Sequence, residues 1–338
     1  MRVARIARSR QPSVVTGHWV RFPVLGAAVL SATVMVGHAT EFPARPLRLV
    51  VPYPAGGNGD VVARILAADM AKGLGQHLVV ETRPGAGGTI GADVVAKAAP
   101  DGHTLLLVTG GHAVAAASYK SLPYQTVDSF SMVSTATFFP FVVVVRADGG
   151  YPSLPALLQA AKAAPGIVKF GSAGPGVTQH LTGELLSKMA GARFLYVPYK
   201  GDAPAVTALL GSEINLIITP TAPVLPHVQS GRFKLIATTG ATRWKGMPEV
   251  PTVAESGVSG FDVSSWIGLA TTAGTPRSAV GRLHAEMQRT LQTAEVSGRL
   301  EQIGGEPRGS TPDEMRNRVA AEVQRWTQVI NDAGIQLQ

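Results

Sequence analysis

The chain has 338 residues, of which 45% are hydrophobic and 15% are charged, and it contains no cysteine. This length and composition supply enough apolar surface for a large core, and they favour two α/β lobes over one small domain. The lack of cysteine excludes disulfides, thiolate metal sites and cysteine catalysis.

The N-terminal residues 1–39 have the pattern of a cleaved secretory signal peptide. They hold five arginines and no acidic residue, and the apolar run Val24–Val36 precedes the small residues of Gly37–Ala39. The run is shorter than the roughly 20 residues needed to span a bilayer, which disfavours a membrane anchor. We therefore expect export to the periplasm. The rest of the chain has 25 basic and 22 acidic residues, a net charge of +3, so no nucleic-acid partner is expected.

Strand-like and helix-like segments alternate along the remainder of the chain. Continuous apolar runs such as Leu105–Val108 indicate strands that are buried on both faces. Repeated strand–helix–strand units predict open, mostly parallel sheets covered by helices. The predicted strands are Leu47–Val51, Leu78–Glu81, Thr104–Thr109, Phe139–Val145, Val168–Gly171, Leu195–Pro198, Ile214–Ile218, Leu235–Thr238 and Val263–Ala270. The predicted helices are Asp60–Lys72 and Thr89–Ala98, a helix that begins at Ser153, and helices that Thr178, Asp202, Thr275 and Thr311 cap. The last of these has a capping box formed by Thr311 and Glu314, and Gly334 ends it.

Two glycine-rich turns connect a predicted strand to a predicted helix. The first is Tyr53–Asp60 and the second is Ser172–Thr178. Glycine lets a ligand approach the backbone closely, and the free N–H groups at a helix start favour an anion. Two such turns on opposite sides of a cleft would hold a small anion between them.

Two predicted strands carry the chain between the lobes. We expect lobe 1 to comprise residues 43–142 plus 264–338 and lobe 2 to comprise residues 143–263. The hinge is then expected near Phe141–Val145 and Val263–Ala270.

Five sequence blocks resemble the extracytoplasmic solute receptors of tripartite tricarboxylate transport systems, called Bug proteins. The first block, Tyr53–Asp60, resembles the family's aromatic-Pro-x-Gly-Gly-x-x-Asp signature. The others follow in the family's order over about residues 43–335: Glu81–Ala92 (with Thr82 where Asn is usual), Ala99–Leu106, Val197–Gly201 and Val250–Glu255.

The resemblance implies a two-lobed periplasmic-binding-protein fold that closes, like a Venus flytrap, on a small carboxylate. Backbone amides and bridging waters would hold the ligand, and a membrane permease or sensor would recognise the closed form. It implies no enzyme activity, and we expect a monomer without a cofactor or a metal. The implied ligand-binding residues are Tyr53, Gly57, Asn58, Thr109, Gly110, His112, Ser172, Gly176, Val177, Thr178, Tyr199 and Thr219.

Three departures from the family pattern bear on the ligand. Ala115 stands where Asn is common, Val177 stands where a smaller residue is common, and Thr219 stands where Asp is frequent. Without a carboxylate at Thr219, a ligand that carries a cationic amino group becomes a weaker expectation.

Other interpretations of single residues stay open. His112 could contact the ligand or pack in the core. His180 and Glu184 have the i, i+4 spacing of metal ligands, although no third ligand is visible nearby. Ser172 is a weak candidate nucleophile, so an exported enzyme acting on a small carboxylate is the alternative function.

Overall fold

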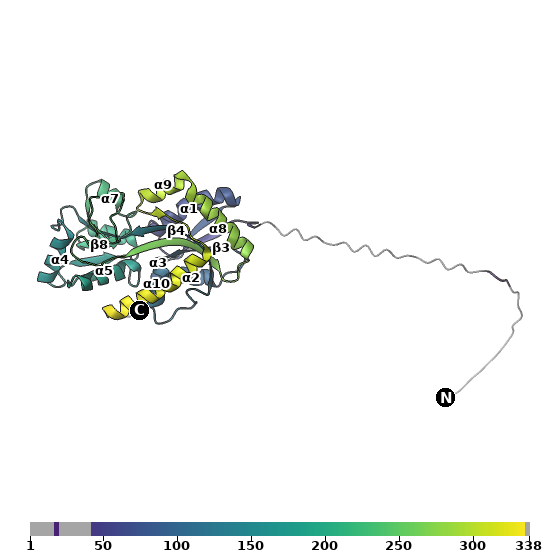
Figure 1. Cartoon of the computed structure of the whole chain (residues 1–338), viewed down its shortest axis with the longest axis horizontal. Coiled ribbons are helices and arrows are strands. Elements are labelled where there is room, and N and C mark those ends of the chain that lie inside the picture. Colours follow the sequence, from purple (N-terminus) through teal and green to yellow (C-terminus); the bar gives the residue numbers. More distant parts are fainter. Residues whose placement is uncertain (1–16, 20–41, 335–338) are drawn as a thin grey trace, which may run out of the picture. The chain divides into compact units, whose positions relative to one another are not determined.

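The computed structural model describes residues 17–19 and 42–334 (Figure 1). Its contacts divide the chain into a unit of residues 1–39 and a compact unit of residues 40–338, and the second unit carries the fold. The expected signal peptide lies outside the described residues except for 17–19. Among the helices of the described ranges, none is long and apolar enough to cross a membrane.

The first sheet has six strands in the order β11-β4-β10-β3-β1-β2. Strands β1, β2 and β3 are parallel, and β10 lies antiparallel between β3 and β4. Because β1 lies between β2 and β3, the helices that follow β1 and β3 leave on opposite faces, which opens a crevice at these strand ends. The strands are β1 (Leu47–Val51), β2 (Leu78–Thr82), β3 (Thr104–Thr109), β4 (Phe130–Pro140), β10 (Ser264–Thr272) and β11 (Glu306–Pro307).

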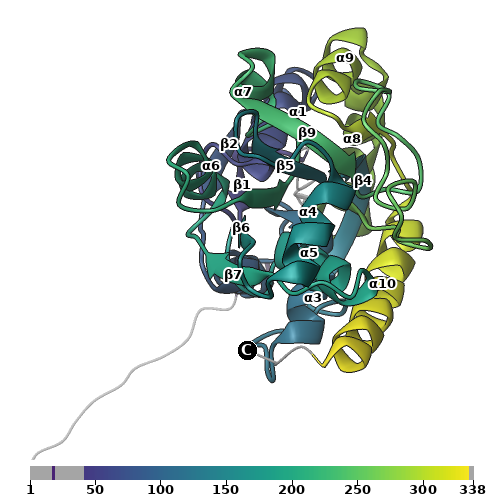
Figure 2. The same cartoon turned by 90° about the vertical axis from the view of Figure 1, so that its left-hand side faces the viewer.

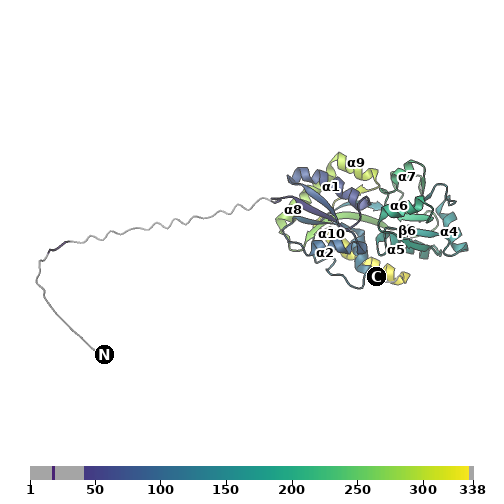
Figure 3. The ribbon, with the colours of Figure 1, turned by 180° about the vertical axis from the view of Figure 1, so that it is seen from behind.

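Alternating side chains of the first sheet pack into two separate cores. In β3, Leu105 and Leu107 belong to the core shared with α1 and α8, whereas Leu106 and Val108 belong to the core shared with α2 and α10. Figure 3 shows α1, α2, α8 and α9 grouped around this sheet. The helices of this part are α1 (Asn58–Leu74), η1 (Ala86–Gly88), α2 (Thr89–Ala96), α3 (Gly110–Ser118), α8 (Arg277–Gln292), α9 (Ala294–Gln302) and α10 (Pro312–Ala333).

The second sheet has five strands in the order β7-β6-β8-β5-β9. Strands β6, β7 and β8 are parallel, and β5 is antiparallel to both β8 and β9. Figure 2 looks onto this side of the chain, with α4, α5 and α6 around the strands. The elements are β5 (Val142–Arg146), α4 (Leu154–Ala163), β6 (Lys169–Ser172), α5 (Thr178–Met189), β7 (Leu195–Pro198), α6 (Asp202–Leu210), β8 (Leu216–Thr219), α7 (Leu225–Gln229) and β9 (Phe233–Thr238).

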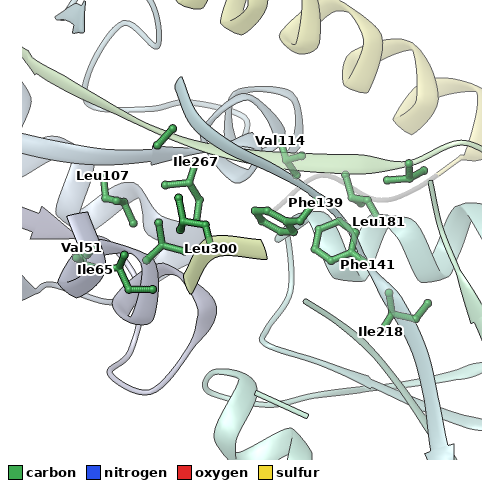
Figure 4. Packing of buried hydrophobic residues seen from close by; sticks show 14 of the residues in the cluster. Val51, Ile65, Leu107, Val114, Phe139, Phe141, Leu181, Ile218, Ile267 and Leu300 are labelled. Atoms are coloured by element: carbon green, nitrogen blue, oxygen red, sulfur yellow. The ribbon is translucent and has the colours of Figure 1, made fainter. Parts of the chain in front are cut away.

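A single buried side chain ties together the two places where the chain passes between the sheets. The hydroxyl oxygen of Thr239 accepts the N–H of Phe141 at 2.9 Å, and the hydroxyl lies 2.6 Å from the carbonyl oxygen of Val263, to which it donates. The Thr239 N–H also donates to the Phe141 carbonyl at 2.9 Å. The rings of Phe139 and Phe141 meet edge to face beside this point (Figure 4).

The structure confirms the expected α/β class with two open, helix-covered sheets. The predicted strand Phe139–Val145 is wrong as a single strand, because Phe141 separates β4 from β5 and bonds to Thr239 instead of a strand neighbour. Three predicted helix caps are also displaced by one residue. The N-caps are Val177, Gly201 and Pro276 in place of Thr178, Asp202 and Thr275. The lobe boundaries stay a prediction.

Candidate functional site

A cavity of about 70 Å³ lies between the strand ends of the two sheets. This is the volume open to the centre of a water molecule, and one water needs about 10–15 Å³ of it, so the cavity has room for several waters. Its lining comes from both sheets: Tyr53, Pro54, Gly57, Asn58, Gly59, Thr109, Gly111, Phe139, Ser265 and Ile267 from the first, Phe141 at the crossing, and Ala173, Val177, Thr178, Gln179, Gly201, Asp202 and Pro220 from the second. No arginine or lysine of the described residues lines it.

Four helices begin at this cavity. The starts of α1 and α3 approach it from the first sheet, and the starts of α5 and α6 approach it from the second. The first N–H groups of a helix have no partner within the helix, and the helix dipole places a partial positive charge there. The cavity is therefore suited to an anion without a basic side chain.

Glycine is required where the two sides meet. Gly201 has φ +112°, and a Cβ at this position would lie 2.9 Å from Cγ of Pro54. A Cβ at Gly57 would lie 3.0 Å from Oδ2 of Asp202. Only residues without a side chain allow this close approach across the cavity.

A hydrogen-bonded group fixes the first-sheet wall. The hydroxyls of Tyr53 and Thr109 lie 2.8 Å apart, and Thr109, the N-cap of α3, also accepts the N–H of Gly111 at 3.0 Å. Burial raises the pKa of Tyr53 to about 12, so this phenol stays neutral. The group holds the starts of α1 and α3 side by side.

Asp202 provides the one carboxylate among the residues that line the cavity. It lies at the start of α6 on the second-sheet side and faces the start of α1, where the backbone N–H of Asn58 favours its charged form. The Thr219 hydroxyl donates to Oδ1 at 3.2 Å, and the Gln179 side chain is also hydrogen-bonded to the carboxylate. Burial raises the pKa of Asp202 to about 6.

The cavity brings together half of the ligand-binding residues predicted from the sequence. These are Tyr53, Gly57, Asn58, Thr109, Val177 and Thr178. They include members of both glycine-rich turns, so the two turns share one cavity.

The other six predicted residues do not line this cavity. Gly110 precedes Gly111, which takes the predicted place in the wall. His112 is buried against Tyr124 and Phe130, and its Nε2 lies 2.9 Å from the carbonyl oxygen of Thr126. Burial lowers the pKa of His112 to about 4, so it is a neutral packing residue in this structure.

The remaining residues of this group also make internal contacts. Ser172 is 1% exposed and its hydroxyl bonds to Gly174 and Tyr196. Gly176 donates its N–H to Nδ1 of His180 at 3.3 Å. Tyr199 packs against the core of the second sheet. Thr219 reaches the cavity only through its bond to Asp202.

The structure corrects the expectation that the cleft lacks a carboxylate. Thr219 has none, but Asp202 places one next to the Thr219 hydroxyl. The sequence pattern at Asp202 indicated only a helix start, because the direction of its side chain depends on how α6 packs. Gln179, Ser265 and Gly111 were missed as well, although Gly111 follows two predicted residues directly.

The structure gives no metal cluster in the part of the chain that it describes. Nε2 of His180 and Oε1 of Glu184 are 3.7 Å apart, and no group of three possible ligands occurs among the residues of 17–19 and 42–334. Burial lowers the pKa of His180 to about 4.

Comparison with known proteins identifies the family. The model of the tripartite tricarboxylate transporter family receptors matches residues 62–335. Protein BugT of Bordetella pertussis is 38% identical over 301 residues, which are 88% of this chain and 92% of BugT.

Two solved structures agree over nearly the same length. The periplasmic binding protein BugD is 35% identical with a TM-score of 0.84, and the match covers 88% of this chain and all of BugD (100%). Rpa4515 of R. palustris, solved with adipate, is 33% identical with a TM-score of 0.85 and the same coverage of 88% and 100%. These similarities confirm the expected periplasmic-binding-protein fold. The chain therefore belongs to the solute-binding receptors of the tripartite tricarboxylate transporter family, the Bug proteins.

Proposed function

We propose that this receptor binds a small carboxylate in the cavity between its two sheets. The observation that supports this most is the meeting of four helix starts at a cavity without arginine or lysine. The bound ligand in Rpa4515, adipate, is a carboxylate of this kind.

The backbone groups are sufficient for useful affinity. A hydrogen bond to a charged group contributes roughly 1.5–3 kcal/mol, and a helix start adds about 0.3–1 kcal/mol. Four such bonds and two helix starts would offset the cost of ordering the ligand and leave about −8 kcal/mol, which corresponds to micromolar affinity. Waters in the cavity would bridge the ligand to donors that it does not reach.

The ligand acts by closing two lobes. We propose that lobe 1 comprises residues 43–142 plus 264–338, that lobe 2 comprises residues 143–263, and that they rotate about Phe141–Val145 and Val263–Ala270. A ligand that touches both sides stabilises the closed form by its greater affinity for that form. A membrane permease, or a sensor, then recognises the closed receptor, which acts as a monomer in the periplasm after removal of residues 1–39.

The contacts of the candidate nucleophile favour a receptor that releases its ligand unchanged over an enzyme. Ser172, the candidate nucleophile, directs its hydroxyl to Gly174 and Tyr196 and does not line the cavity. His180 accepts from Gly176 through Nδ1, and no hydrogen bond joins it to Ser172 among the described residues.

A ligand screen by thermal unfolding tests the proposal. The exported protein is mixed with mono-, di- and tricarboxylates at millimolar concentration. A ligand of micromolar Kd should stabilise it by about 4 kcal/mol, a clear rise in Tm. Lack of stabilisation by any acid would reject carboxylate binding, and steady formation of product would favour the enzyme.

A further inference from the structure

Asp202 is a carboxylate in the cavity that forms no ion pair with a basic side chain of the described residues. Its partners are the Asn58 N–H, the Thr219 hydroxyl and the Gln179 side chain, all of them neutral donors. The ion pairs within 4.0 Å among the described residues include none to Asp202. The nearby acid Asp60, in contrast, pairs with Arg64 at 2.9 Å.

An unpaired carboxylate in such a place costs stability. Asp202 is held by neutral donors of the same kind that would bind a ligand anion, and they compensate only part of its loss of hydration, because burial raises the pKa of Asp202 to about 6. Asp202 also occupies the Asn58 N–H at the start of α1, which would otherwise hold a ligand anion. A residue that only filled space or capped a helix would not need this charge inside the cavity.

We propose that Asp202 selects a ligand that carries a cationic group, a protonated amine, beside its carboxylate. This inference rests on the proposed function. The ligand carboxylate lies at the helix starts that Asp202 leaves free, namely those of α3 and α5, and the amine pairs with Asp202. The cavity is thus divided into an anion-binding part and an acidic part, which suits a zwitterionic or amino-substituted acid.

Other ionisable groups around Asp202 do not supply this selectivity. Tyr53 stays neutral because burial raises its pKa to about 12, and His180 stays neutral because burial lowers its pKa to about 4. Glu184, whose pKa burial raises, faces His180 and does not line the cavity. Lys200 is exposed, and it makes no ion pair within 4.0 Å of Asp202 in the described structure.

Calorimetric titration with matched acids tests the inference. The pairs are aspartate and succinate, glutamate and glutarate, 2-aminoadipate and adipate, and alanine and propionate, each measured with the exported protein at pH 7.5. We expect the amino member of the best-bound pair to bind roughly 10- to 100-fold tighter than its partner, the range for a hydrogen bond between charged groups. Asp202→Asn should bring this ratio close to one, whereas the exposed control Asp332→Asn should leave it unchanged.

The pH dependence gives a second measurement that does not need a variant. Affinity for the amino acid should fall between pH 7.5 and pH 6 because Asp202 becomes protonated, while affinity for the unsubstituted acid, expressed for its fully ionised form, should not fall. Equal affinity within every pair, or an unchanged ratio in Asp202→Asn, would overturn the inference and leave carboxylate binding intact. Lack of binding by either member of every pair would instead reject the proposed function.

Discussion

Replacing Asp202 with asparagine should make the ligand-free protein more stable at neutral pH. Asparagine keeps an oxygen that can accept the Asn58 N–H and the Thr219 hydroxyl, and only the charge is removed. Burial raises the pKa of Asp202 from 3.8 to about 6, so the folded protein holds this proton more tightly than the unfolded chain does. Ionisation of Asp202 as the pH rises therefore lowers the free energy of unfolding of the wild type.

The size of the effect follows from the pKa shift. A shift of roughly two units corresponds to about 3 kcal/mol, since each unit is worth about 1.4 kcal/mol. Relative to Asp202→Asn, the wild type should lose this stability between about pH 4 and about pH 6.5, and little more at higher pH. In a chain of this size the difference at neutral pH amounts to about 6 °C in Tm.

Thermal and urea unfolding of both proteins from pH 4 to pH 8, without ligand, measures the difference. Other groups titrate in this range, including Glu322, whose pKa burial raises to about 7. They contribute equally to both proteins, so the difference between the two curves isolates Asp202. Asp332→Asn serves as the control for loss of one exposed acid. Curves that stay parallel over the whole pH range would refute the reasoning.

Three further substitutions test the cavity and the crossing. Gly57→Val should abolish carboxylate binding by calorimetry, because even its Cβ would lie 3.0 Å from Oδ2 of Asp202; Gly281→Val, with open space around it, should bind normally. Val177→Asp should prevent anion binding at the start of α5, because its carboxylate would take the N–H groups of that helix start, and retained affinity would contradict this. Thr239→Val should lower the free energy of unfolding by about 2–4 kcal/mol, because the Phe141 N–H and the Val263 carbonyl lose a buried partner. Urea unfolding measures this change, and an unchanged urea midpoint would show that these two hydrogen bonds do not stabilise the fold.

Elements with strong local signals could be predicted from the sequence. The apolar run of Thr104–Thr109 gave strand β3 with its observed bounds. The capping box at Thr311 and Glu314 and the left-handed Gly334 at the end of α10 were also expected. In each case neighbouring residues carry the signal, so no long-range contact was needed to find it.

Elements that depend on tertiary contacts were missed. Serine and threonine interrupt the apolar residues of the first nine positions of β4, and their polar groups bond far along the chain, as Thr135 does to Arg308 and Ser310. Helix α3 begins with two glycines, which are poor helix formers, and it is held by the Thr109 cap.

Half of the predicted ligand-binding residues line the candidate site, because only some of the lining depends on local sequence signals. The glycine-rich turns gave the cavity walls, whereas the side chains that enter the cavity depend on how helices pack. Asp202 reaches Asn58 only because α6 begins opposite α1, and no local pattern encodes that meeting.

The Thr239 tie has a consequence for how the receptor can move. One hydroxyl joins both backbone crossings, so a rotation of the two proposed lobes would keep these buried hydrogen bonds, whereas a sliding motion would break them. Closure as proposed would then be a rotation about this one point. The length of the bound acid would then set the final angle, and a permease could distinguish a correct cargo from a wrong one by that angle alone.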